Sequence, residues 1–146
     1  MLSIVQKTTA ILILSLALAA CGASKKAQPI TGSLPQITND NARIYFYRSK
    51  VPFLAAIEPE FLVDGKSVGK AVMNQALYRD AQPGNYVIMI SSDMDKPVEI
   101  TLSSGETRYI RAYGTTSVIR TYLSIGEVSK EQALKDLKGQ KLLAPE

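Results

Sequence analysis

Few side chains of this 146-residue chain could carry out chemistry, and the missing types exclude whole classes of site. The chain contains no histidine and a single cysteine, Cys21. Ser-His-Asp triads, Cys-His dyads and zinc sites built on Cys and His therefore cannot be assembled within it. Paired carboxylates remain and could serve acid/base catalysis or calcium binding: Glu58 with Glu60, and Asp93 with Asp95. Both pairs read as solvated loop charges, so we predict no catalytic residue, no metal site and no cofactor.

Cys21 has the most specific surroundings of any residue in the chain. One lysine lies within residues 1–7, residues 10–17 are almost wholly apolar, and Leu-Ala-Ala directly precedes the cysteine. The 13 residues from 8 to 20 are too few for a transmembrane helix, which needs about 20. An ordinary secretory signal is the other alternative, but it gives no reason for the only cysteine to stand at this position.

The Leu-Ala-Ala-Cys run resembles the lipobox of bacterial lipoprotein signals. The resemblance implies that residues 1–20 are a removed signal peptide and that the Cys21 thiol receives diacylglycerol, with further palmitate-like acylation. Two or more acyl chains anchor a protein stably, since each buried methylene contributes about 0.8 kcal/mol. Gly22 stands where an aspartate would favour retention in the inner membrane, so we expect an outer-membrane lipoprotein that faces the periplasm.

A second set of side chains could recognise a partner. Tyrosine and arginine alternate along three expected strands, at Arg43, Tyr45, Tyr47, Tyr109, Arg111, Tyr113, Arg120 and Tyr122. If the first strand and the last two are neighbours, these residues form one surface suited to a protein or a glycan, because Tyr and Arg are enriched at binding hot spots. The alternative is structural, since tyrosine is a preferred strand residue whose ring covers a sheet face.

Short β-rich runs separated by turn signals must position these side chains. The pattern predicts eight strands, at residues 42–48, 60–63, 66–70, 75–79, 86–91, 98–103, 107–113 and 118–125. Asp64-Gly65 is the strongest hairpin signal, and the run at 86–90 is apolar on both faces, which favours a central strand. We therefore predict an all-β fold, an antiparallel β-sandwich.

One short helix is expected near the C-terminus. Ser129 and Gln132 form a capping-box pattern, the apolar residues 133, 134 and 137 follow helical spacing, and Gly139 marks the end. We expect the leucines of this helix to pack on the edge of the sandwich and residues 140–146 to be frayed.

The regions outside the strands complete the domain organisation. Residues 21–41 comprise the lipidated cysteine and a predicted flexible tether, which as a coil would hold the domain about 25 Å from the bilayer. Residues 42–146 form one domain, and the net charge of +4 is too small to indicate a nucleic-acid partner.

Four strings of residues resemble a family of small bacterial lipoproteins with a domain of unknown function: ARIYFYR at 42–48, LVDGKSVGK at 62–70, AQPGNYVIMI at 81–90 and SSGETRYIRAY at 103–113. The resemblance implies a transthyretin-like or carboxypeptidase-regulatory-like sandwich without an assigned activity.

We therefore predict a non-enzymatic cell-envelope lipoprotein that binds a protein or a cell-wall component at the membrane surface. The alternatives are an accessory lipoprotein of a secretion apparatus and a cell-wall glycan hydrolase that uses carboxylates.

Overall fold

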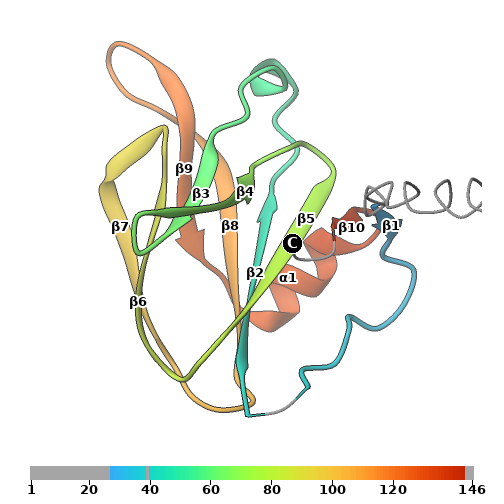
Figure 1. Ribbon diagram of the computed structural model, residues 1–146. Coiled ribbons are helices and arrows are strands. Elements are labelled where there is room, and N and C mark those ends of the chain that lie inside the picture. Colours follow the sequence, from blue (N-terminus) through green and yellow to red (C-terminus); the bar gives the residue numbers. More distant parts are fainter. Residues whose placement is uncertain (1–26, 39, 144–146) are drawn as a thin grey trace, which may run out of the picture.

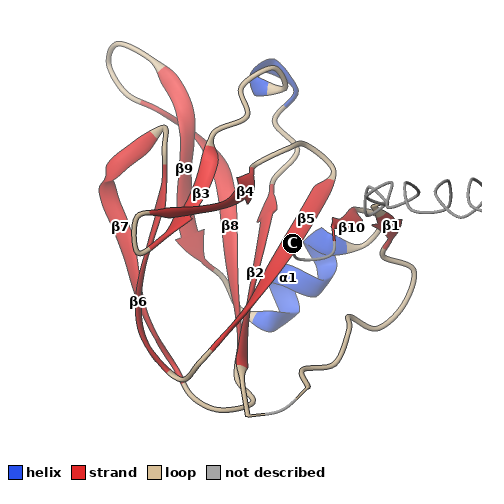
Figure 2. Cartoon of the chain, in the orientation of Figure 1, coloured by secondary structure: helices blue, strands red, loops and turns tan. Residues whose placement is uncertain are grey.

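The computed structural model describes residues 27–38 and 40–143, and within them two β-sheets pack face to face. One α-helix of this part lies against the outside of the larger sheet (Figures 1 and 2). The predicted all-β sandwich with a short C-terminal helix is confirmed. The signal segment and Cys21 lie outside the described residues.

The larger sheet has six strands in the order β1-β10-β5-β2-β8-β9. These are β1 (Gln28–Pro29), β2 (Ala42–Arg48), β5 (Gln75–Ala81), β8 (Thr107–Thr116), β9 (Thr121–Glu127) and β10 (Lys141–Leu143). The expected neighbourhood of the first predicted strand and the last two is confirmed, as β2-β8-β9. The sheet is mixed rather than purely antiparallel, because β2 runs parallel to β8 and β10 runs parallel to β5. The chain forms the whole smaller sheet, together with β5, between β2 and β8, and so supplies the long connection that a parallel pair needs.

The smaller sheet has four antiparallel strands in the order β4-β3-β6-β7. These are β3 (Glu60–Val63), β4 (Lys66–Lys70), β6 (Gly84–Ile90) and β7 (Asp93–Leu102). The two-residue turn between β3 and β4 is confirmed, with φ of 49° at Asp64 and 77° at Gly65, as the favoured hairpin turn requires. The central place predicted for the apolar run of β6 is confirmed as well.

The two faces of β2 serve different layers of the molecule. Ile44 and Phe46 point into the core between the sheets, where the Phe46 ring lies 5.2 Å from that of Phe61. Tyr45 and Tyr47, on the alternate face, belong to a second buried cluster on the outside of the larger sheet. Because successive side chains of a strand point to opposite faces, β2 contributes to the core between the sheets with one face and to the cluster outside the larger sheet with the other.

The helix α1 (Lys130–Leu137) covers that second cluster. Its N-cap is confirmed, because the Ser129 hydroxyl accepts a hydrogen bond from the backbone N–H of Gln132 at 3.2 Å. Its expected place on the sandwich edge is wrong: Ala133 and Leu137 are buried against the outer sheet face, while Leu134 remains 44% exposed. An apolar helix stripe buries most area against a broad apolar surface, and tyrosine rings provide that surface here.

Two short strands fall in segments where none was predicted. β1 lies within the expected tether and β10 within the expected frayed tail, and they pair with each other at the edge of the larger sheet. Ile30 donates its N–H to the carbonyl of Gln140 at 2.8 Å, and Ile30 and Leu34 pack against the cluster under α1. The tether prediction is therefore wrong for residues 28–37, which belong to the folded body. Strands of two and three residues are too short for their alternation to be recognised in the sequence. Their pairing also depends on a distant contact, because α1 returns the chain to β5, beside which β10 lies.

Candidate functional site

The structure brings together most of the tyrosines and arginines predicted to form one face. Tyr45 pairs with Tyr109 and Tyr47 with Arg111 across the β2–β8 ladder. The rings of Tyr45 and Tyr109 stack at 5.6 Å with an interplanar angle of 10°. We call the three rings of Tyr45, Tyr47 and Tyr109 the tyrosine layer.

The tyrosine layer is covered, so the prediction that it offers an open binding surface is wrong. Tyr45, Tyr47 and Tyr109 are at most 5% exposed beneath α1 and residues 30–37, and Arg43 beside them is 3% exposed. The sequence pattern correctly placed these side chains on one face. It gave no sign that this face is packed against other elements, because the covering segment resembles a linker and the helix has only eight residues.

Asp136 of α1 fixes the helix to the layer. Its carboxylate accepts the Tyr47 hydroxyl at 2.8 Å, lies 3.4 Å from the Arg111 guanidinium and accepts the Gln132 amide at 2.7 Å. Burial, with help from the Asp136 hydrogen bond, raises the pKa of Tyr47 well above its ordinary value. The tyrosine therefore stays neutral and acts as a hydrogen-bond donor at physiological pH.

Arg43 fixes the N-terminal segment in the same way. Its guanidinium bonds both oxygens of Asp80 on β5, lies 4.1 Å from the centre of the Tyr78 ring and donates to the Pro35 carbonyl at 2.7 Å. The Asp80 hydrogen bonds raise the pKa of Arg43 further above its usual range. This residue is therefore a structural clamp between two strands and residues 33–37.

An open groove of about 470 Å³ remains between α1 and residues 33–37. Tyr45 and Tyr109 form part of its floor, with Lys130 and Leu134 on the helix side. Little of either ring is reachable through it, because both tyrosines are nearly inaccessible to solvent. The groove therefore offers a partner mainly residues 33–37 and the exposed side of α1, and not the tyrosine rings.

The rest of the predicted face lies toward β9 and is more exposed. Tyr113 and Tyr122 are half-buried, and Arg120 is exposed with its guanidinium 4.7 Å from the centre of the Tyr122 ring. Arg120 lies in the tip of the β8–β9 hairpin, where Ser117 donates its N–H to the Arg120 carbonyl at 2.8 Å. The predicted strand 118–125 is therefore wrong at its start, since β9 begins at Thr121.

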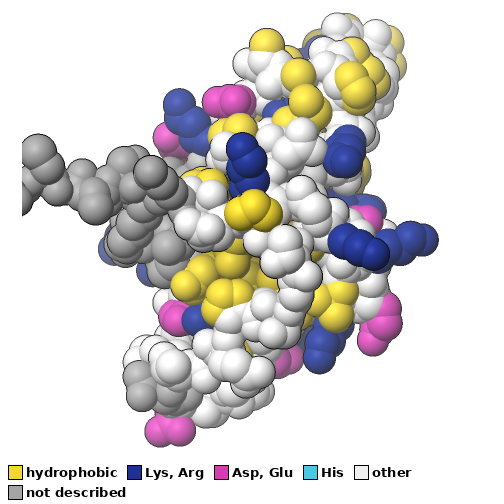
Figure 3. Space-filling model, turned by 90° about the vertical axis from the view of Figure 1, so that its right-hand side faces the viewer, with side chains coloured by type: hydrophobic (Ala, Val, Ile, Leu, Met, Phe, Trp, Pro, Cys, Tyr) yellow, Lys and Arg dark blue, Asp and Glu magenta, His cyan; other side chains and the backbone are white. Residues whose placement is uncertain are grey.

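Large apolar side chains gather at the same end of the sandwich, and the sequence analysis missed them. They are 45–104% exposed, and we call them the loop end: Phe53, Ile57, Met94, Val118 and Ile119. They come from the β2–β3 connection, the start of β7 and the β8–β9 hairpin, all of which lie toward the upper end of Figure 1. The space-filling view shows several separate yellow hydrophobic side chains among white ones at this upper end (Figure 3). The sequence did contain a signal for this exposed apolar surface, because apolar residues stand inside two turn-like segments, VPFLAAIEP and TTSVIRT.

A buried arginine holds the β2–β3 connection in place. Arg48, at the end of β2, is fully buried and donates to the carbonyls of Leu54 at 2.6 Å, Ile57 at 2.7 Å and Ala71 at 3.0 Å. The first two carbonyls belong to the segment that includes the short helix η1 (Pro52–Leu54) and presents Phe53. Arg48 thereby positions one side of the loop end.

The predicted carboxylate pairs do not form a shared site. Asp93 is buried and accepts the Ser124 hydroxyl at 2.6 Å, whereas Asp95, Glu58 and Glu60 are exposed. Within residues 27–38 and 40–143, no three His, Cys, Asp or Glu side chains come together as possible metal ligands. No helix among the described residues is long and apolar enough to cross a bilayer.

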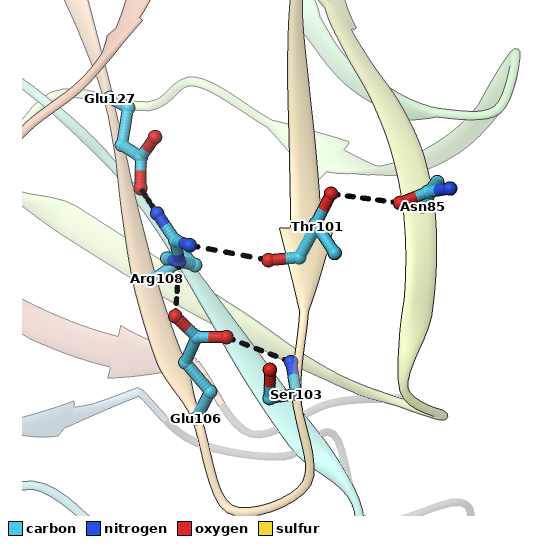
Figure 4. Close-up of polar contacts among 6 residues, drawn as sticks. All are labelled: Asn85, Thr101, Ser103, Glu106, Arg108 and Glu127. Carbon is cyan, nitrogen blue, oxygen red and sulfur yellow. Dashed lines mark hydrogen bonds and ion pairs between the residues drawn. The ribbon is translucent and has the colours of Figure 1, made fainter.

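The most extensive polar network is found at the opposite end and links the two sheets (Figure 4). Arg108 of β8 bonds Glu106 and Glu127 at 2.7 Å each and the Thr101 carbonyl of β7 at 3.3 Å. Glu106 in turn accepts the Ser103 N–H, which lowers the pKa of its carboxyl. Every charge here has a partner within the network, so we interpret it as a brace of the β7–β8 turn.

Comparison with known proteins identifies one family. A family model described as "Protein of unknown function (DUF2846)" matches residues 38–124, more than half of the chain. The matched range contains both sheets except β1, β10 and the end of β9, and it stops before α1. No curated protein and no solved structure matches the chain.

Proposed function

The chain belongs to the DUF2846 family of proteins of unknown function, and from that premise we propose that it is a bacterial cell-envelope lipoprotein without enzymatic activity. In this proposal, acyl chains on Cys21 anchor it to the outer membrane on the periplasmic side. The loop end binds a partner protein.

The exposure of the loop end is the observation that carries the binding proposal. Val118 is fully exposed, Ile119 is 89% exposed and Phe53 is 77% exposed. Each such side chain would gain about 1.5–3 kcal/mol from complete burial at an interface. Apolar patches on one end of a small domain, with Arg and Tyr beside them, are typical of protein interaction sites.

The chemistry of the loop end favours a protein over a cell-wall glycan. Val118 and Ile119 are aliphatic and β-branched, so they offer apolar area without hydrogen-bond donors. Sugar hydroxyls must exchange their bonds to water for bonds to the protein, and unpaired polar groups are costly to bury. Apolar side chains on a partner protein would fit this surface better.

A double substitution at the hairpin tip tests the binding proposal. Val118→Ser with Ile119→Ser should reduce partner recovery after crosslinking at least about tenfold, because it removes most of the apolar area at the tip. The free energy of unfolding should change by less than about 0.5 kcal/mol, since both side chains lie in solvent. Leu134→Ser on α1 is the matched control, because Leu134 is a partly exposed apolar residue outside the loop end.

Site-specific crosslinking identifies the kind of partner. A photoreactive residue at position 119 should yield one discrete protein adduct, while the same residue at Val87, exposed on the smaller sheet, should not. Equal yields from both positions would contradict the proposal, and an adduct that carries glycan would indicate a cell-wall component instead.

The anchor has a test of its own. Cys21→Ala should abolish incorporation of labelled palmitate and move the protein from the membrane to the soluble fraction, because the substitution removes the acylated sulfur. Mass spectrometry of the wild-type protein should find an N-terminal acylated Cys21. A free thiol at that position, or residues 1–20 still attached, would refute the anchor.

A further inference from the structure

We propose that the β1–β10 edge of the larger sheet rests on anionic phospholipid headgroups of the leaflet that holds the anchor. The inference builds on the proposed acylation of Cys21, and it adds an orientation of the domain and a class of lipid. It follows from three features: the short link to β1, the charges beside β1 and the position of the loop end.

The link between the anchor and the folded body is short. Only six residues separate Cys21 from Gln28, where β1 begins. Seven residue steps reach at most about 25 Å when fully extended, and about 15 Å as a coil. The β1–β10 edge is thus held near the bilayer surface, where the charge of the headgroups can act on it.

Exposed lysines lie on both sides of the point where the chain enters the domain. Lys141 is paired with Pro29 across the β1–β10 ladder, and Lys138 directly precedes Gly139, whose N–H approaches the Ile30 carbonyl at 3.5 Å. Both lysines are exposed. In the sequence, Lys25 and Lys26 stand directly before the described part of the chain. Two exposed lysines of the described residues therefore flank this point, and two more precede it in the sequence.

Acidic groups near this edge are fewer than the lysines, and in the sequence Glu146 stands three residues after β10. The acidic residues of α1 are Glu131, in its first turn, and Asp136, whose carboxylate is bonded to Tyr47 and paired with Arg111. Lys130 and Lys135 of the same helix add two more exposed cations. A lysine within about one Debye length, 8–10 Å, of an anionic leaflet strengthens binding by a factor of about five.

The same orientation leaves the loop end accessible. The tip of the β8–β9 hairpin lies on the far side of the molecule from β1 and β10 in Figure 1. With the basic edge against the lipid, Val118 and Ile119 would face away from it. A partner could then bind without competing with the bilayer.

The test uses the chain from position 21 to Glu146 with Cys21→Ala, so that binding does not depend on acylation. We expect it to cosediment with vesicles of phosphatidylcholine that contain about one-third phosphatidylglycerol, and not with pure phosphatidylcholine vesicles. Lys138→Gln with Lys141→Gln should weaken this partitioning about 25-fold. Salt at about 0.5 M should abolish it.

The matched control removes two lysines elsewhere. Lys66→Gln with Lys96→Gln changes the net charge equally, but both exposed lysines lie on the smaller sheet, at β4 and β7, and not on the sheet that contains β1 and β10. Equal weakening in both double variants would overturn the proposed edge, and equal binding to both kinds of vesicle would overturn the lipid class. Failure of the anchor is seen separately, as a loss of palmitate labelling in the wild-type protein.

Discussion

Arg48→Ala is expected to lower the free energy of unfolding by about 2–4 kcal/mol, a large loss for the substitution of one polar residue. The side chain has no exposed surface and donates to the carbonyls of Leu54, Ile57 and Ala71. Its removal takes this donor from all three carbonyls. The Leu54 carbonyl keeps the Ile57 N–H at 2.9 Å, whereas the carbonyls of Ile57 and Ala71 lose their bond to Arg48, and each group that stays buried and unsatisfied costs about 1–3 kcal/mol. Urea denaturation followed by far-ultraviolet circular dichroism measures the change.

Two further variants separate the contacts of Arg48 from its charge. Arg120→Ala removes an exposed arginine of the hairpin tip and should change stability by less than about 0.5 kcal/mol. Arg48→Lys keeps a cation and donors without the planar fork, so it should lose an intermediate amount. If Arg48→Ala were as stable as Arg120→Ala, the three hydrogen bonds would not support the β2–β3 connection.

Leu137→Ala is expected to cost about 2–5 kcal/mol, because it opens a cavity between α1 and the tyrosine layer. Leu137 is 1% exposed and packs in one cluster with Tyr45, Tyr47 and Tyr109. The chain has no tryptophan and seven tyrosines, so tyrosine fluorescence and near-ultraviolet circular dichroism include the three rings of the layer without a tryptophan background. Both signals should change in the variant.

Leu134→Ala is the matched control for this prediction. Leu134 lies on the same helix but is 44% exposed, and its truncation should cost less than about 1 kcal/mol. If the Leu137→Ala protein had unchanged stability, α1 would not be packed tightly over the tyrosine layer. In that case the tyrosines would again be candidates for an open binding surface.

The strand pattern of the central domain could be predicted from the sequence because it depends on local chemistry. In ARIYFYR the alternation of Ile44 and Phe46 with Tyr45 and Tyr47 sets which side chains share a face, wherever the strand lies. Asp64-Gly65 specified its turn through the positive φ angles that these residues tolerate. The cap at Ser129 specified the start of α1 in the same way. None of these features requires knowledge of distant residues.

Only the tertiary structure decided which faces are buried and which remain open. The tyrosine layer is covered because α1 and residues 30–37 fold back over it, and their amphipathic character is too weak to reveal that partner in the sequence. Arg48 looks like the polar end of a strand, yet it is buried because three carbonyls from the β2–β3 and β4–β5 connections converge on it. The loop end is exposed for the opposite reason, since no other described segment reaches Val118 or Phe53. Burial depends on contacts between segments far apart in the chain, whereas periodicity and turns depend on neighbours, so the sequence determined the elements and their faces while the fold determined their environment.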